Sequence, residues 1–217
     1  MPVPPALLAR GPWDPEEILV SWRTEPFQPD PSSSEHADRL LDGLRRRGSP
    51  CHDGLAARLV GYEVDDGTLK LELQPVRWAI RLLPDNAAAS MSALCVVRSA
   101  DGSWLAGHRA GWLATWAGRW ALGAGGSVEV DEHPARTLGR ELEEEWSVRP
   151  ERLTVEVLIQ FPSELVMLVG QAWLSPGASV TPDHEHDTFA WWPAEPDRWP
   201  VEADAPLRAL SAIVASA

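Results

Sequence analysis

The chain is poor in the features that mark secreted, membrane-spanning and disulfide-stabilised proteins. Its two cysteines, Cys51 and Cys95, form neither a metal-ligand pair nor a disulfide framework, and Cys95 lies in an apolar run typical of a buried core. No segment reaches the length of a membrane span. Residues 1–10 lack the basic start and the long apolar stretch of a signal peptide. These absences lead us to expect a cytoplasmic protein with no membrane partner.

Positive charge is scarce as well. The formal net charge is −13, the pI is near 4.8, and Lys70 is the only lysine. Binding to nucleic-acid polymers or to anionic membranes needs a basic surface, so we expect neither. An acidic enzyme can still act on anions if a bound metal cation supplies positive potential locally. The length of 217 residues suits one large domain or two small ones.

The most informative feature of the chain is a fixed pattern over residues 126–148. Gly126 is followed after five residues by Glu132, and after seven more by the run Arg140-Glu141-Leu142-Glu143-Glu144-Glu145-Trp146-Ser147-Val148. Six fixed residue types at fixed offsets over 23 positions are hard to obtain by chance. The pattern therefore marks a functional segment.

The second half of this segment is predicted to be a helix. Pro134 suits a first helical turn, where its missing N–H would be unsatisfied anyway. Pro150 bounds the far end. Ala135, Leu138 and Leu142 recur at helical spacing and form one apolar face, which indicates that this face is buried.

Three carboxylates form a stripe beside that apolar face. At roughly 100° per residue, Glu141, Glu144 and Glu145 adjoin one another, Glu145 lies nearest the apolar edge, and Glu143 points away. Like charges at this spacing repel, and burial worsens the repulsion unless a cation sits among them. Hard oxygen ligands favour Mg²⁺ or a similar divalent ion. The alternative is a solvated acidic helix face, but the matching offsets of Gly126, Glu132 and Arg140 favour a metal site.

The segment and its lead-in, Gly118-Arg-Trp120-Ala-Leu-Gly-Ala-Gly125-Gly126, resemble the box of the Nudix hydrolases. The match holds at every box position except Ser147, which replaces glycine. The resemblance implies an α/β fold, namely an α/β/α sandwich with a mixed sheet. It also implies a loop–helix–loop that binds a divalent metal and a diphosphate. Ser147 would end the helix in a left-handed conformation, where a side chain costs about 0.5–1 kcal/mol.

The family's functional residues can be carried onto this chain position by position. The resemblance implies that the metal ion, Mg²⁺ or Mn²⁺, is held by the main-chain carbonyl of Gly125 and by Glu141, Glu144 and Glu145. Glu141 and Glu145 are the most dependable ligands, and Glu144 also counts among the catalytic residues. Arg140 and Glu132 would pair and brace the loop against the helix. They would support catalysis by positioning the metal ligands, without taking part in the reaction.

Further acids occur in the segment Asp183-His184-Glu185-His186-Asp187. Many Nudix enzymes draw a general base or an additional metal ligand from this region. We predict that Glu185 has that role, with Asp187 as second choice. A polar surface loop is an equally weighted alternative, and the His-x-His pair alone is weak evidence for a metal site.

Four residues around the glycine-rich lead-in are candidates for substrate binding. Trp112 and Trp116 lie on an expected loop, where an aromatic face can stack on a nucleobase. Arg109 and Arg119 flank that loop and could hold phosphates, although single arginines are more often surface charge.

Alternating apolar residues and turn signals divide the chain near residue 87. We expect a small α+β appendage over residues 1–86 and the Nudix domain over residues 87–217. In the appendage we expect a loop at 28–34, a helix at 35–47, and strands at 55–64 and 67–83 joined by a hairpin turn at 65–67. In the Nudix domain we expect strands at 91–98, 103–107, 153–161, 164–174 and 188–192 and a closing helix at 205–215.

The chain as a whole also resembles, loosely, the eukaryotic Nudix hydrolases that cleave UDP-glucose. The likeness lies in His52-Asp53-Gly54-Leu55-Ala56-Ala57-Arg58-Leu59 and in the segment from His184 to Trp192. These observations predict a metal-dependent hydrolase that cleaves the diphosphate of a nucleoside diphosphate linked to another moiety, such as UDP-glucose or another nucleotide sugar. The alternatives are a non-catalytic nucleotide-binding Nudix module with a regulatory role, or a pyrophosphatase acting on ADP-ribose or nucleoside triphosphates. The expected partner is a small nucleotide diphosphate substrate, and the sequence is compatible with a homodimer.

Overall fold

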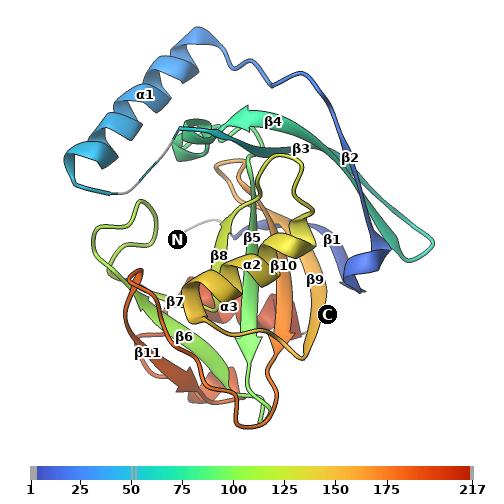
Figure 1. The fold of residues 1–217 in the computed structure, drawn as a ribbon, viewed down its shortest axis with the longest axis vertical. Helices are drawn as coiled ribbons and strands as arrows, with labels where there is room; N and C mark the ends of the chain where they lie inside the picture. Colours follow the sequence, from blue (N-terminus) through green and yellow to red (C-terminus); the bar gives the residue numbers. More distant parts are fainter. Residues whose placement is uncertain (1–3, 50, 52, 216–217) are drawn as a thin grey trace.

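The computed structural model describes residues 4–49, 51 and 53–215. His52, the first residue of the segment compared with the UDP-glucose hydrolases, lies outside the described residues. Two sheets dominate the structure, and a long helix covers one end of it (Figure 1). In the described ranges, no helix has the length and apolar character needed to cross a membrane.

The larger sheet has eight strands and mixed direction. Its main path runs β1–β9–β10–β5–β6–β11, while β7 pairs with β6 and β8 pairs with β5. The β10–β5 pair is parallel and the other pairs are antiparallel. The strands are β1 (Ala6–Trp13), β5 (Met91–Arg98), β6 (Trp104–Arg109), β7 (Trp120–Leu122), β8 (Ala124–Ser127), β9 (Arg152–Gln160), β10 (Val166–Trp173) and β11 (His186–Trp192).

Two helices cover opposite faces of this sheet. Helix α2 (Pro134–Trp146) packs on one face, where Cys95 of β5 belongs to the same buried cluster as the apolar side chains of α2. Helix α3 (Ala205–Ala215) packs on the other face, where the neighbouring strand residue Val96 clusters with Leu207. Successive strand side chains point to opposite faces, so one strand serves both cores. The predicted α/β/α sandwich with a mixed sheet is confirmed.

The smaller sheet belongs to the N-terminal part of the chain. It has the order β2–β4–β3, with β2 (Ile18–Trp22), β3 (Leu55–Asp65) and β4 (Thr68–Arg77). Helix α1 (Pro31–Arg46) packs through Ala37 and Leu41 against the 3₁₀ helix η2 (Trp78–Leu82), which directly follows β4. Two further 3₁₀ turns, η1 (Pro15–Glu17) and η3 (Pro196–Arg198), connect elements elsewhere.

The division between the two sheets does not coincide with the expected boundary at residue 87. Strand β1, which lies in the first 13 residues, pairs with β9 at the edge of the large sheet. Strand β3 in turn reaches the box, because the Ala57 amide donates to the Val128 carbonyl at 2.8 Å. An isolated bridge between Ala56 and Glu129 extends this contact. The N-terminal 86 residues are therefore joined to the box loop by main-chain hydrogen bonds.

Two expectations for the N-terminal part are wrong. Residues 31–34 are not a loop, because Asp30 accepts a hydrogen bond from the Ser33 amide at 2.9 Å and caps α1 there, with Pro31 in the first turn. The strand expected over 67–83 ends at Arg77, after which the chain turns into η2. The hairpin turn between β3 and β4 is confirmed.

In the C-terminal part, the predicted strands and the closing helix are confirmed to within two residues at their ends. Strands β1, β2, β7 and β8 were not expected. They are short or interrupted by glycine and proline, so they carry little alternation to detect.

Candidate active site

Helix α2 is held in place by its two ends. Pro134 occupies its first turn, and the His133 ring accepts a hydrogen bond from the Ala135 amide at 3.2 Å. At the other end Ser147 adopts the left-handed conformation, with φ 52° and ψ 36°. The conformation predicted for the family's glycine is therefore kept although the residue is serine.

The box loop is tied to α2 by an ion pair. Arg140 Nε donates to Glu132 Oε1 at 2.8 Å, and Arg140 Nη2 donates to Glu132 Oε2 at 3.1 Å. Thr137 Oγ1 and the Glu129 amide also donate to Glu132, at 2.8 and 3.1 Å. Desolvation alone would raise the pKa of the Glu132 carboxyl, but these contacts together outweigh it and lower the pKa. The pairing implied by the family resemblance is present in the structure.

The four glutamates of α2 have very different surroundings. Glu145 is buried, with 4% of its surface exposed, and the Glu141 side chain is largely buried. The Glu144 side chain is 58% exposed, and Glu143 faces solvent and pairs with Arg149 at 2.7 Å. The helical phase inferred from the sequence is therefore confirmed.

Burial changes the acidity of the two inner carboxyls. Desolvation raises the pKa of Glu141 to about 7, even though Arg140 opposes this shift. Desolvation also raises the pKa of Glu145 well above its usual value, and the negative charges of Glu141 and Glu185 add to the rise. The site therefore concentrates carboxylate oxygens whose charge is poorly compensated by the protein itself.

Glycine at position 126 lets the Glu141 carboxylate approach the main chain. A Cβ atom at this position would lie 2.1 Å from Glu141 Oε1 and 2.4 Å from its carboxyl carbon. A side chain cannot be accommodated at such a distance, so steric exclusion explains why glycine occupies this position of the box.

Glu145 has one oxygen bound and one without a partner. Its Oε1 accepts a hydrogen bond from the Gly125 amide at 2.9 Å, which places the Gly125 main chain beside the carboxylate. Its Oε2 is buried and has no hydrogen-bond partner among the described residues. The nearest ring nitrogen, Nε2 of buried His186, lies 3.6 Å away, too long for a hydrogen bond. A buried carboxylate oxygen without a partner is costly when charged, so the group either takes up a proton or binds a cation.

The buried carboxylates have the donor chemistry that suits a divalent cation. Glu141 and Glu145 supply hard oxygen atoms of the kind that Mg²⁺ and Mn²⁺ prefer. In the structure, part of the negative charge is compensated by Arg140. Its Nη1 lies 2.7 Å from Glu141 Oε1 and 3.1 Å from Glu144 Oε2. Across residues 4–49, 51 and 53–215, no three His, Cys, Asp or Glu side chains are grouped closely enough to hold a metal ion.

Glu185 lies in the loop before β11 and faces Arg109, the last residue of β6. Its Oε2 is 3.3 Å from Arg109 Nη2, and its main-chain carbonyl accepts a hydrogen bond from the Ala110 amide at 2.8 Å. The charge of Glu185 raises the pKa of both Glu141 and Glu145, so it belongs to the same electrostatic cluster. Asp187, the second choice for this role, lies 3.5 Å from the His108 ring instead.

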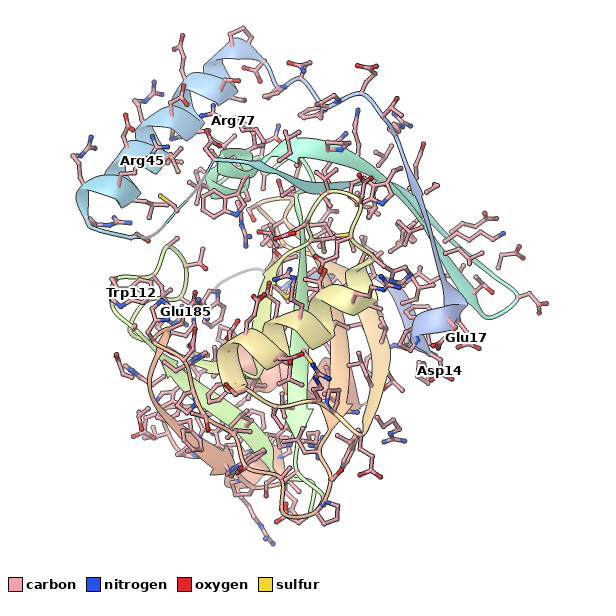
Figure 2. All side chains as sticks on the ribbon, viewed as in Figure 1. Asp14, Glu17, Arg45, Arg77, Trp112 and Glu185 are labelled. Atoms are coloured by element: carbon pink, nitrogen blue, oxygen red, sulfur yellow. The ribbon has the colours of Figure 1, made fainter. Side chains whose placement is uncertain are left out.

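The four candidate substrate-binding residues divide into two groups. Arg109 pairs with Glu185, and the Trp112 ring stacks on His184 with centroids 5.4 Å apart, so both lie at the Glu185 loop (Figure 2). Arg119 instead forms an ion pair with Asp204, next to the start of α3, and its guanidinium lies 4.4 Å from the centre of the Trp116 ring. The structure therefore places Arg109 and Trp112, but not Arg119 and Trp116, beside an acid of the cluster.

A cavity of about 490 Å³ opens beside the box acids. One wall comes from the N-terminal part of the chain and the other from the box. The lining residues are Leu55, Ala56 and Trp78 on the first side and Ser127, Glu129, Val130, Arg140 and Glu141 on the second.

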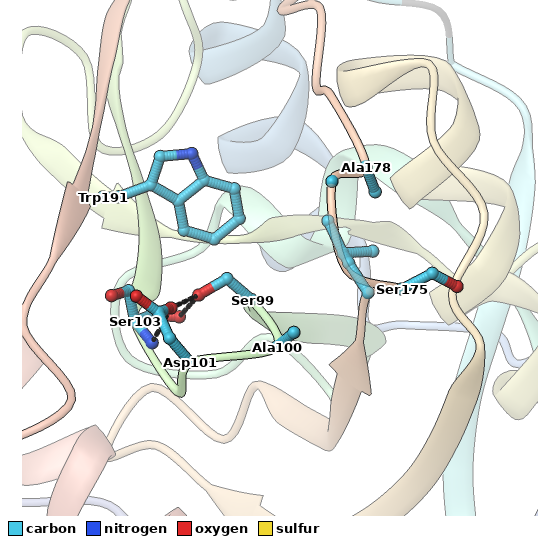
Figure 3. Close-up of a pocket in the computed structure, with 9 residues that line it drawn as sticks. Ser99, Ala100, Asp101, Ser103, Ser175, Ala178 and Trp191 are labelled. Atoms are coloured by element: carbon cyan, nitrogen blue, oxygen red, sulfur yellow. Dashed lines mark hydrogen bonds between the residues drawn. The ribbon is translucent and has the colours of Figure 1, made fainter.

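A second cavity, of about 290 Å³, lies between the β5–β6 turn and the loop after β10. In Figure 3 the Trp191 ring stands above Ser99, which hydrogen-bonds to Asp101. Ser103 also donates to Asp101, through its amide, at 3.3 Å. None of the box acids lines this cavity, so we place the candidate active site at the first one.

Comparisons with known proteins identify the family of the chain. The family model of the NUDIX domain matches residues 89–204, more than half of the chain, and the chain therefore belongs to the Nudix family. Nudix hydrolases act on pyrophosphate bonds of nucleoside diphosphate derivatives and generally use divalent metals such as Mg²⁺ or Mn²⁺. Family membership makes this chain a hydrolase of that class.

Several solved structures resemble parts of the chain. A MutT protein from Methanosarcina mazei Go1 is 25% identical, with 47% of this chain and 75% of that chain covered and a TM-score of 0.40. The MutT structure reported for Aliivibrio salmonicida and Vibrio cholerae is 18% identical, with 59% and 98% covered and a TM-score of 0.46. A Caenorhabditis elegans Ap4A hydrolase is 20% identical, with 58% and 99% covered and a TM-score of 0.42. No curated protein matches the chain.

The structure also brings to the site residues that the sequence did not single out. Trp78 and Ser127 line the cavity, and Arg81 donates a hydrogen bond to Ser127. His186, which the sequence offered only as half of a His-x-His pair, is buried beside Glu145. No spacing rule connects residue 78 with residue 127, so their contact could not be predicted. His186 precedes the strand expected at 188–192, so the sequence gave no signal of its burial.

Proposed function

We propose that the protein is a metal-dependent diphosphatase that cleaves a nucleoside diphosphate linked to another moiety. The observation that carries the proposal is the buried Oε2 of Glu145, which has no partner among the described residues and lies in one electrostatic cluster with Glu141. Glu141 and Glu145 would hold Mg²⁺ or Mn²⁺, assisted by Glu144 and by the Gly125 carbonyl. When bound, such a cation polarises phosphoryl oxygens and helps water to ionise.

The remaining residues have distinct roles in this proposal. Glu185 accepts the proton of the attacking water, whose oxygen forms a new bond to phosphorus while the bridging P–O bond breaks. Arg109, 3.3 Å from Glu185, orients that carboxylate. Glu132 and Arg140 keep the loop against α2, so that Gly125 and Glu145 stay in contact. Trp112, which stacks on His184 beside Glu185, is proposed to contact the substrate, and Trp116 and Arg119 stay candidates for substrate binding.

We propose UDP-glucose, or another nucleotide sugar, as the substrate. The support is the loose resemblance of residues 52–59 and 184–192 to the UDP-glucose hydrolases. Residues of both segments lie near the cluster, with Leu55 and Ala56 in the cavity wall and Glu185 beside Arg109. Hydrolysis would yield UMP and glucose 1-phosphate.

The proposal is tested with the purified full-length protein and UDP-glucose, ADP-ribose and nucleoside triphosphates, in Mg²⁺, Mn²⁺ or EDTA. We expect cation-dependent hydrolysis, with UDP-glucose cleaved fastest and its products separated by chromatography. Glu145→Gln should lose about 100-fold or more of the activity, because charge at the cation is removed. Glu143→Gln is the matched control, since the same change on the same helix affects an exposed residue.

Three outcomes would each overturn a different part of the proposal. Faster cleavage of ADP-ribose or of a triphosphate would overturn the substrate and leave the reaction class standing. Retained activity in Glu145→Gln would overturn the metal-ligand role of Glu145. Nucleotide binding without turnover in either cation would favour the alternative of a regulatory module. Mg²⁺ or Mn²⁺ should also raise the melting temperature of the wild-type protein but not of Glu141→Gln/Glu145→Gln.

A further inference from the structure

Two side chains of the N-terminal part lie at the box loop. Both come from the 3₁₀ helix η2 (Trp78–Leu82). Trp78 Nε1 donates a hydrogen bond to Ser127 Oγ at 3.1 Å, and Arg81 Nη1 donates to the same hydroxyl. The Arg81 guanidinium lies 5.6 Å from the centre of the Trp78 ring. Ser127 directly follows the box glycine, so η2 is held against the start of the box.

The position of η2 is fixed by the rest of the N-terminal part. Asp53 Oδ1 accepts from the Ala79 amide at 3.3 Å, and its Oδ2 accepts from Arg77. The Gly54 carbonyl accepts from the Trp78 amide at 2.8 Å. Ile80 is fully buried in the cluster formed with α1. Asp53 and Gly54, which belong to the segment compared with the UDP-glucose hydrolases, therefore anchor η2 and with it the two side chains at the box.

The guanidinium of Arg81 forms no ion pair within the part of the chain that the structure describes. No carboxylate of the described residues lies within ion-pair distance of its guanidinium, whereas Arg140 has three such partners. Desolvation lowers the pKa of Arg81 to about 10, and it stays protonated at neutral pH. A desolvated cation without a counter-charge is costly, and an anionic ligand would compensate it.

The charge of Arg81 interacts with charged residues of the candidate active site. After desolvation, the charges that act on the pKa of Arg81 are those of Glu141, which raises it, and of Arg109, which lowers it and contacts Glu185. Trp78 lines the same cavity as Glu141 and Arg140. A ligand that reaches Glu141 through this cavity would therefore pass the Trp78 ring and come close to the Arg81 guanidinium.

We propose that Arg81 binds a phosphate oxygen of the diphosphate ligand, and that Trp78 forms the wall against the group attached to that phosphate. Arg81 is thus a substrate-binding residue that the N-terminal part of the chain supplies to the box. The inference rests on the proposed function, since it assumes a diphosphate ligand at the box. It gives the N-terminal part a role in recognition in addition to its role in the fold.

The experiment measures binding of inorganic pyrophosphate by calorimetry in Mg²⁺ buffer, together with kcat and KM for the best substrate. Arg81→Gln should bind pyrophosphate about 10-fold or more weakly and should raise KM by a similar factor. Arg81→Lys keeps the charge but loses the planar two-donor fork, so affinity should fall about threefold or more. Arg39→Gln, an exposed arginine of α1, is the matched control and should change neither quantity.

Each result decides the inference separately from the proposed function. Unchanged pyrophosphate affinity in Arg81→Gln, or no binding by the wild type, overturns the role of Arg81 even if hydrolysis is observed. Binding that depends on Arg81 without any hydrolysis supports the role and overturns the proposed reaction. If Arg81→Gln does not fold, an unchanged affinity in Arg81→Lys overturns the role. Equal melting temperatures of the variants and the wild type exclude a loss of binding through unfolding.

Discussion

At the scale of single residues, one amino-acid type serves three purposes along α2. Glu145 and Glu141 are drawn into the protein by their position beside the apolar face, and burial raises the pKa of each carboxyl. Glu144 lies one helical turn after Arg140 and is more exposed, and Arg140 forms ion pairs with both Glu144 and Glu141. Glu143 points to solvent, where Arg149 lowers its pKa. The angle around the helix axis, and not the residue type, decides which carboxyl belongs to the site.

Gly126→Ala should impair the site without unfolding the protein. The added Cβ would lie 2.1 Å from Glu141 Oε1, so the carboxylate must move. A displacement of about 1 Å at a catalytic group typically costs on the order of 100-fold in rate, and we expect a loss of that size in steady-state hydrolysis. Gly139→Ala is the control, because a Cβ there meets nothing within 4 Å. It should keep the activity and stabilise the helix by about 0.5–1 kcal/mol, and equal activities of the two variants would contradict the steric argument.

Without metal, stability should fall as the pH rises through the range in which Glu141 ionises. Its pKa is about 7 in the folded protein and 4.5 in the unfolded chain, so the folded state binds the proton more tightly between these values. Stability from this group is thus fully present below pH 4.5 and is lost as the pH approaches 7, by about 1–3 kcal/mol. Urea unfolding in EDTA at pH 5 and pH 7.5 should show a smaller difference in Glu141→Gln. The same difference in both proteins would be the contrary result.

At the scale of elements, helix ends and short connections position the site more than the long strands do. Helix α2 begins with Pro134 and ends at left-handed Ser147. The 3₁₀ helix η2 ends β4 and turns Trp78 and Arg81 toward Ser127. Each of these features depends on one or two residues, so each can be tested by a single substitution.

Restoring the family's glycine at the end of α2 should stabilise the protein. Ser147 has φ 52°, a conformation in which a side chain costs about 0.5–1 kcal/mol, and Ser147→Gly removes that cost. We expect a gain of this size in the free energy of unfolding, with little change in activity. Ser147→Ala keeps the Cβ atom and should show no gain. A stable Ala variant equal to the Gly variant would show that backbone strain is not the cause.

At the scale of the whole molecule, the two sheets depend on each other. Strand β1 closes the β9 edge of the large sheet, and its Trp13 is buried there with 2% of its surface exposed. Strand β3 holds the box loop through the Ala57–Val128 hydrogen bond and the Ala56–Glu129 bridge. The box is thus supported from one side by α2 and from the other by the N-terminal sheet.

A chain shortened to residues 87–217 should therefore be much less stable than the full protein. Loss of β1 leaves the β9 edge open and removes Trp13 from its core, and burying such a side chain is worth about 3–5 kcal/mol. We expect a lower melting temperature and aggregation in size-exclusion chromatography. Removal of residues 1–5 alone, which precede β1, should have little effect. A shortened chain as stable and monodisperse as the full protein would contradict this dependence.

How far the sequence predicts this protein can be judged from particular elements. The boundaries of β5 and α3 were predicted to the residue, because alternation and helical spacing are local signals. Helical spacing also predicted that Glu145 and Glu141 lie beside the buried face of α2 and that Glu143 points away from it. The start of α1 differs from the expected one, because its first turn has the Pro/Ser-rich composition of a loop and only the capping hydrogen bond of Asp30 distinguishes it as helical.

The sequence by itself determined the box and the phase of its helix, since both lie within 23 consecutive residues. The pairing of Glu132 with Arg140 was implied by the family resemblance, and the structure contains it. Only the tertiary structure decided which distant groups meet the box. It brought η2 to Ser127, Glu185 to Arg109, and β1 to the β9 edge. The physical reason is that such contacts follow from how whole sheets and loops pack, and residue spacing carries no information about contacts between segments far apart in the chain.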